Sequence, residues 1–184
     1  MDQNTDIIQA DQYLTFILDK ETYAIEIVKV REVIDYAYVT RVPRMPAYMC
    51  GVINLRGSVV PVIDLRLILG MSAVEKTIET CIIIAEVTME DDMLHVGMLA
   101  DSVQEVIDVD PNQIDPPPRM GSRLDTGFIK GMGKRDDRFF IILNIDKVLT
   151  GDEIAAIQHV RNARSNTAAP PSAVDTALRA PSPP

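Results

Sequence analysis

The residues of this sequence that could do chemistry are few and scattered. His95 and His159 are the only imidazoles, and neither has a partner at the spacing of a metal site or a catalytic triad. Paired aspartates at 91–92 and 136–137 lie in polar stretches typical of solvated turns. The stretch "GMGKRDD", residues 131–137, lacks the glycine spacing and the Ser or Thr of a phosphate-binding loop. The residues therefore predict no catalytic group, no metal site and no cofactor.

Composition narrows the class of protein further. Lys and Arg number 18 against 27 Asp and Glu, a net charge of −9, which argues against nucleic-acid binding because phosphate contacts need a basic face. Cys50 and Cys81 lack a CxxC spacing and have apolar neighbours, which predicts unreactive thiols. The start of the chain has no signal-peptide pattern, and no apolar run reaches the roughly 20 residues of a membrane span. We therefore expect a cytoplasmic protein.

One segment presents a single cation on a buried framework. In "GVINLRGSVVPVIDLR", residues 51–66, two β-branched runs flank Gly57, which predicts a hairpin with Arg56 at its tip. An exposed arginine is worth about 0–1 kcal/mol as a solvated charge, whereas in a desolvated interface it can contribute about 2 kcal/mol or more. The hairpin alone favours the first interpretation and leaves a binding role open.

The elements that would carry this hairpin are mostly strands. Alternating or continuous apolar residues predict strands at 12–19, 22–39, 52–65, 81–88, 93–109 and 138–149. Three apolar residues then recur at the spacing of one helix face, which predicts a helix over 152–164. They are Ile154, Ile157 and Val160. Residues 1–11 and the Pro- and Ala-rich residues 165–184 are expected to be a disordered lead-in and tail.

An internal repeat organises the strands. The pattern V-x-E-V-I-D occurs at 30–35 and again at 103–108, an offset of 73 residues. Later, residues 51–70 parallel 127–151, with Asn144 standing where Asp64 stands in the first copy. Two matches in the same order favour a duplicated unit over chance recurrence in a Val- and Ile-rich chain. Such a unit predicts two similar β subdomains that close into barrels to hide their strand edges.

Three stretches together resemble the chemotaxis coupling proteins of the CheW family. They are "QYLTFILDKETYAIEIVKVREVI", "TRVPRMPAYMCGVINLRGSVVPVIDLR" and "GFIKGMGKRDDRFFIILNIDKVL". The resemblance covers about residues 12–150, and the block N-L-R-G-x-x-V-P-x-x-D-L-R is highly specific to this family and to the regulatory domain of the kinase CheA.

The resemblance implies a mainly all-β fold. Two SH3-like five-stranded β-barrel subdomains would pack around a shared hydrophobic core, followed by the C-terminal helix. The CheW-like domain would span 12–151, with subdomains of about 22–80 and 95–150 and a contribution from the N-terminal strand.

The implied function is that of an adaptor without enzymatic activity. It would couple the cytoplasmic tips of transmembrane chemoreceptors to the regulatory domain of the CheA histidine kinase and help build arrays, with weak self-association within them. The protein would cluster at the inner face of the membrane through the receptors. A coupling paralogue of a twitching or biofilm pathway is the main alternative, and a small-molecule-binding or enzymatic barrel is a remote one.

Receptor-binding residues carry over where the motifs match. Arg56, with Asn54 beside it, resembles the arginine that touches the receptor tip. Ile27, Val30 and Glu32 would face the receptor in a groove between the subdomains, although strand alternation alone would place Ile27 or Val30 in the core.

Kinase-binding residues are expected on two loops. The stretch "TRVPRM" supplies Arg41, Val42 and Met45. The stretch "IDPPPRM" supplies Asp115, Arg119 and Met120. The second loop departs from the family pattern, because three consecutive prolines stiffen it and Met120 stands where an aromatic residue is common.

Overall fold

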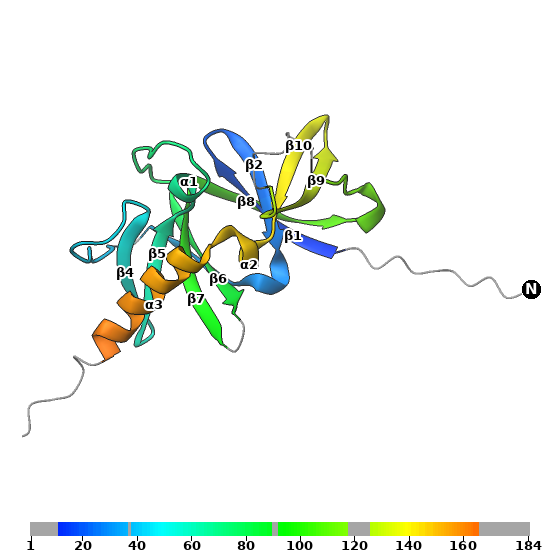
Figure 1. Ribbon diagram of the computed structural model, residues 1–184. Coiled ribbons are helices and arrows are strands. Elements are labelled where there is room, and N and C mark those ends of the chain that lie inside the picture. Colours follow the sequence, from blue (N-terminus) through cyan, green and yellow to red (C-terminus); the bar gives the residue numbers. More distant parts are fainter. Residues whose placement is uncertain (1–10, 37, 90–91, 118–125, 166–184) are drawn as a thin grey trace, which may run out of the picture.

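The described part of the protein consists of ten strands, four short helical turns and a longer C-terminal helix. The computed structural model describes residues 11–36, 38–89, 92–117 and 126–165 (Figure 1). The strands are β1 (Asp11–Leu18), β2 (Glu21–Glu26), β3 (Val30–Asp35), β4 (Met49–Leu55), β5 (Ser58–Asp64), β6 (Cys81–Thr88), β7 (Met93–Ala100), β8 (Ser102–Val109), β9 (Ile129–Arg135) and β10 (Arg138–Leu143). The helices are η1 (Ile27–Lys29), α1 (Leu65–Ile68), η2 (Pro111–Gln113), α2 (Ile145–Val148) and α3 (Gly151–Ser165).

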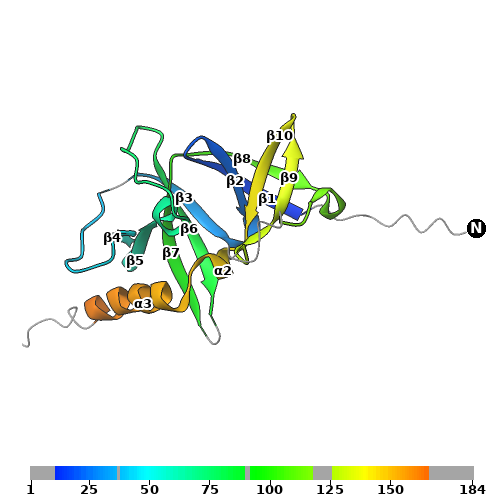
Figure 2. The ribbon, with the colours of Figure 1, turned by 45° about the horizontal axis from the view of Figure 1, so that its top comes forward.

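The strands form two five-stranded sheets, which lie side by side in Figures 1 and 2. The first sheet has the order β8-β1-β2-β10-β9, and the second has the order β3-β6-β7-β5-β4. Neighbouring strands are antiparallel except β2–β10 and β5–β7, which are parallel. The mainly β fold with two five-stranded sheets and a C-terminal helix confirms the predicted fold class.

Each sheet curls so that its edges approach at one backbone bridge. Thr40, beyond β3, pairs with Val52 of β4, and Asp115, beyond β8, pairs with Met132 of β9. A glycine lies beside each bridge, because a Cβ at Gly51 would collide with the Thr40 carbonyl and one at Gly131 with the chain at 114–115. The two sheets thus close in the same way.

Each copy of the repeat predicted from the sequence contributes strands to both sheets, so neither sheet corresponds to a single copy. The V-x-E-V-I-D segments become the edge strands β3 and β8, and the matched hairpins become β4–β5 and β9–β10. Hence β1–β5 correspond in order to β6–β10, yet each sheet takes two strands from one copy and three from the other.

The sheets therefore divide the chain differently from the expected boundaries of 22–80 and 95–150. The first sheet contains 11–26 and 102–143, and the second contains 30–100. The reason is local, because the two-residue turn at 19–20 keeps β2 paired with β1. Of the expected lead-in 1–11 and tail 165–184, residues 1–10 and 166–184 lie outside the described residues, whereas Asp11 begins β1 and Ser165 ends α3.

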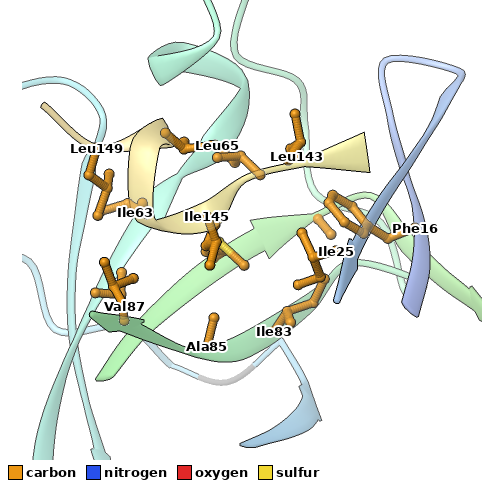
Figure 3. Packing of buried hydrophobic residues seen from close by; sticks show 14 of the residues in the cluster. Phe16, Ile25, Ile63, Leu65, Ile83, Ala85, Val87, Leu143, Ile145 and Leu149 are labelled. Carbon is orange, nitrogen blue, oxygen red and sulfur yellow. The ribbon is translucent and has the colours of Figure 1, made fainter. Parts of the chain in front are cut away.

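Apolar side chains fill three clusters. The largest lies between the sheets and takes Phe16 and Ile25 from the first sheet and Ile83 and Val87 from the second (Figure 3). A smaller cluster lies within each sheet's own curl, one around Ile82 and Ile84 and the other around Tyr13 and Phe140. Both faces of β6 are therefore buried, which explains its continuous apolar run.

The C-terminal helix completes the shared cluster. Ile157 and Val160 of α3 are fully buried and Ile154 packs against the same cluster, as the helical spacing predicts. Figure 1 shows α3, in orange, beside the second sheet, where it packs on β5.

Both cysteines are free thiols, and burial raises the pKa of Cys50 and of Cys81.

Candidate functional site

The hairpin β4–β5 ends in a two-residue turn that holds Arg56 outward. Arg56 and Gly57 have φ values of 51° and 88°, and Leu55 pairs directly with Ser58. Two positive φ angles are typical of the turn that matches the twist of a hairpin. The Asn54 side-chain oxygen accepts a hydrogen bond from the Gly57 amide at 2.9 Å. Asn54 therefore stabilises the turn that presents Arg56.

Arg56 forms an ion pair with Glu32 of β3, the strand at the opposite edge of the same curled sheet. The Arg56 Nη2 and Glu32 Oε2 atoms lie 2.9 Å apart, although the Arg56 side chain remains 80 % exposed. An exposed pair of this kind contributes little to stability, so the guanidinium can exchange its partner at small cost. The structure thus brings together three of the five predicted receptor-binding residues, Asn54, Arg56 and Glu32.

A hollow of about 350 Å³ lies behind this ion pair, and we call it the Arg56 hollow. Besides Glu32 and Arg56 it is lined by side chains of β3, β5, β6 and β7, including Val60, Ile84 and His95. Val60 and Ile84 close its floor but are almost fully buried, so the surface that the hollow offers is mainly its ionic rim together with the partly buried Leu55.

Sequence reasoning missed part of this rim. Glu86 of β6 pairs with Arg31 at 3.2 Å and with the His95 Nε2 atom at 3.5 Å. Arg31 and His95 line the hollow, and Glu86 holds both from beside it. The only available signal was the position of Arg31 beside Glu32, because Glu86 and His95 meet through strand pairing. His95, considered above for acid–base chemistry, instead borders a candidate binding surface.

Ile27 and Val30 lie elsewhere. Ile27 begins η1 and Val30 begins β3, and both are partly buried against the shared cluster between the sheets. Neither lines the Arg56 hollow. Between them Val28 is 80 % exposed, so the crossing from the first sheet to the second carries an apolar side chain on its surface.

The first group of predicted kinase-binding residues lines another hollow of about 400 Å³, which we call the Arg41 hollow. Arg41, Val42 and Met45 form part of its wall, with Tyr36 and Lys76 on the same wall. The Lys76 ammonium lies 5.1 Å from the centre of the Tyr36 ring, a cation–π distance.

Only one member of the second group can be placed. Asp115 is exposed, and its backbone makes the bridge to Met132 that closes the first sheet. Arg119 and Met120 lie outside the described residues.

A buried ion cluster that sequence reasoning missed fixes one crossing between the sheets. Arg66 of α1 is only 1 % exposed and forms a two-pronged contact with Asp64, both distances being 2.9 Å. Its third contact is with Asp101 at 2.5 Å, and Asp101 in turn accepts a hydrogen bond from the Asp19 amide. Hydrogen bonding to Asp64 raises the pKa of the Arg66 guanidinium above its ordinary value. Because Asp101 joins β7 to β8, the cluster ties the second sheet to the first.

The other crossing is fixed by a contact of reversed charge. Lys29, between β2 and β3, pairs with Asp146 of α2 at 2.7 Å. Thr88 at the end of β6 donates its amide to Asp146 and accepts a hydrogen bond from Lys29. We call the cluster of Arg66, Asp64 and Asp101 the buried clasp. We call the contact between Lys29 and Asp146, whose side chains are partly exposed, the exposed clasp.

Neither a metal site nor a membrane-spanning helix is found in the part of the chain that the structure describes. Across 11–36, 38–89, 92–117 and 126–165, no three His, Cys, Asp or Glu side chains gather as metal ligands would. In the same residues, no helix combines the length and the apolar character needed to cross a membrane.

Comparison with known proteins gives consistent results. Residues 12–153 match the family described as "CheW-like domain". The chain is 34 % identical over 149 residues to the chemotaxis protein CheW of Klebsiella aerogenes, covering 81 % of this chain and 87 % of that protein. It is 36 % identical over 145 residues to the chemotaxis protein CheW of Bacillus subtilis, covering 78 % and 90 %.

A solved structure resembles the fold. The crystal structure of the scaffolding protein TtCheW from Thermoanaerobacter tengcongensis matches with a TM-score of 0.68 and 35 % identity. The match covers 78 % of this chain and 97 % of that chain. Since the matched share accounts for nearly all of that protein, both sheets of the present fold have a counterpart there.

Proposed function

This chain belongs to the CheW-like domain family, and on that basis we propose that it is a chemotaxis scaffold that couples chemoreceptors to the CheA histidine kinase. The proposal assigns it no enzymatic step. It would work by holding two other proteins in a fixed relation and by supporting the assembly of arrays. The clasps support this role, because a scaffold must keep the surfaces on its two sheets in register.

The receptor would dock on the Arg56 hollow. A receptor tip is a helical hairpin, and a helix that carries charged side chains beside an apolar face suits the charged rim of the hollow and its partly buried Leu55. Arg56 would exchange Glu32 for an acidic group on the helix, a switch that the 80 % exposure of its side chain permits. The Arg56–Glu32 pair at the edge of this hollow is the observation that carries the proposal.

The kinase regulatory domain would dock on the loops of the two sheets. Arg41, Val42 and Met45 line one hollow together with Lys76, and Asp115 begins the Pro-rich sequence that contains Arg119 and Met120. Each contact would be small, near or below the roughly 1,200 Å² of a weak interface. Many copies held together at the inner face of the membrane by the receptors would supply the strength.

The receptor contact is tested by Arg56→Glu. The variant should fold normally, because the side chain is exposed, but co-sedimentation with receptor-containing membranes should fall at least about tenfold, as for loss of a hot-spot side chain. Lys147→Glu makes the same charge change at an exposed position of α2 and should sediment like the wild type. Unchanged co-sedimentation of Arg56→Glu would remove this residue from the receptor contact.

The kinase contact is tested by Arg41→Glu. Pull-down by the isolated regulatory domain of CheA should weaken while receptor co-sedimentation stays normal, because Arg41 lines a different hollow from Arg56. Equal loss of both partners would indicate a folding defect, and equal retention would exclude Arg41 from the kinase contact.

A further inference from the structure

The first sheet carries a counterpart of the Arg56 hollow. Its hairpin β9–β10 also ends in a two-residue turn, and residues 136–137 have positive φ values of 48° and 61°. Glu105 of the edge strand β8 pairs with Arg135 at 3.3 Å, just as Glu32 of β3 pairs with Arg56 at 2.9 Å. Glu32 and Glu105 occupy the same position of the repeated V-x-E-V-I-D pattern. The glutamate is therefore equivalent in the two copies, whereas the arginines differ in position: Arg135 is the last residue of β9, where Leu55 stands in β4, and it reaches Glu105 from the strand rather than from the turn.

A hollow lies behind this second ion pair as well, and we call it the Arg135 hollow. It measures about 200 Å³ and adjoins another of about 390 Å³, with Ile107, Arg135 and Phe140 shared between the two. Phe139 lines the first and is 56 % exposed, and Val106 lines the second and is 47 % exposed. Phe139 and Val106 therefore give the rim of the hollow an exposed apolar surface, whose contact with water is unfavourable.

The cations of the hairpin leave one positive group uncompensated at this rim. Lys134 pairs with Asp137 at 3.0 Å, and Arg135 is shared between Glu105 and a more distant Asp136 at 3.9 Å. Arg138 lines the hollow, and its side chain makes no ion pair with any residue in the described ranges. In a chain of net charge −9, an exposed guanidinium without an intramolecular carboxylate complements an acidic partner.

We propose that the Arg135 hollow is a second docking surface for a carboxylate-bearing amphipathic helix, of the same chemical kind that the Arg56 hollow takes. The inference rests on the proposed function, which supplies the helical partner of the first hollow. The apolar face of the helix would cover Phe139, and one of its carboxylates would bind Arg138. One copy of the chain would then hold two helical tips, one on each sheet, which raises the avidity of an array without any additional protein.

The experiment is a calorimetric titration of the full chain with a soluble fragment of a chemoreceptor cytoplasmic tip. The wild type should bind two fragments per chain. Arg138→Glu combined with Phe139→Ala should weaken one site at least about tenfold, the effect of losing a hot-spot side chain. Both side chains are exposed and Arg138 makes no ion pair within the described residues, so the variant should fold. Arg56→Glu should remove the other site, and Lys147→Glu, the matched control, should keep both.

The outcomes separate this inference from the function on which it rests. Two sites that respond independently to the Arg56 and the Arg138/Phe139 substitutions support the second surface. A second outcome is a single site that is lost in Arg56→Glu and unaffected by the Arg138/Phe139 change. This outcome overturns the second docking surface and leaves the proposed function in place. Absence of any binding, or two sites that ignore Arg56→Glu, contradicts the proposed receptor contact, and retention of both sites in the Arg138/Phe139 variant overturns the inference in either case.

Discussion

The buried clasp and the exposed clasp occupy equivalent places in the duplicated fold, yet their charges are reversed. In each, the second residue of a short helix after a hairpin reaches the crossing between the sheets, Arg66 toward Asp101 and Asp146 toward Lys29. The buried clasp has Asp64 as a second anion, whereas Asn144 stands at that position in the other copy. The fold thus demands a polar contact at each crossing, but either order of charges provides it.

The difference in burial decides how much each clasp contributes. The Arg66 side chain is 2 % exposed, whereas those of Lys29 and Asp146 are 23 % and 31 % exposed. A planar guanidinium holds Asp64 through two parallel hydrogen bonds, and a lysine ammonium makes only point contacts. Removing one partner of a buried pair leaves an uncompensated charge, while water replaces a partner lost at the surface. We therefore expect the two crossings to differ strongly in their sensitivity to mutation.

The largest effect is expected for Arg66→Ala. The substitution would leave the Asp64 carboxylate buried without its cation, which costs about 3–5 kcal/mol of the free energy of unfolding. Urea unfolding followed by circular dichroism measures this loss, and Arg66→Lys, which keeps the charge without the two-pronged contact, should lose less. A loss below about 1 kcal/mol for Arg66→Ala would mean that the crossing does not depend on the buried clasp.

A smaller effect is expected for Lys29→Ala. Asp146 would keep its hydrogen bond from the Thr88 amide and gain water, so the free energy of unfolding should fall by about 1 kcal/mol. The same urea experiment measures it. Because the two clasps share no residue, the double variant Arg66→Lys with Lys29→Ala should show additive losses within about 0.5 kcal/mol. Clear non-additivity would show that the two crossings open together.

The smallest effect is expected for the surface pair between Arg161 of α3 and Asp92, whose side chains are 34 % and 56 % exposed. Hydrogen bonding from Arg161 lowers the pKa of Asp92 below its ordinary 3.8, so the contact is complete above that pH and is lost as the pH falls through the folded-state pKa. Arg161→Ala should raise the pKa of Asp92 toward its ordinary value in an NMR titration. At neutral pH the free energy of unfolding of the Arg161→Ala variant should equal that of the wild type within experimental error. A large loss would show that this pair contributes as much to stability as the buried clasp.

The local elements of this fold could be predicted because their signals are local. Alternation and the Gly57 turn placed the hairpin around Arg56, and helical spacing placed Ile157 and Val160 in the core. The repeat predicted two similar units for the same reason. Which strands pair across some 70 residues could not be derived, because edge strands such as β3 and β8 carry the same pattern and would fit either sheet.

The candidate site was predictable in part, and for a related reason. Glu32 and Arg56 were expected at one surface from the resemblance, and the structure pairs them. Arg66 was missed, because an arginine two residues past the end of a strand resembles a solvated charge until the fold buries it. Glu86 and His95 meet only through the pairing of β6 with β7, which no short stretch of sequence encodes.

The exchange of strands between the two copies has a consequence for engineering. A cut after Glu75, in the exposed segment 72–79 that joins the copies, would produce pieces of 75 and 109 residues, and each would lack strands of both sheets. Neither piece could form a complete hydrophobic core alone, so each would need the strands of the other in order to fold. The chain is therefore suited to fragment complementation, in which an intact scaffold forms only when two separately produced halves meet.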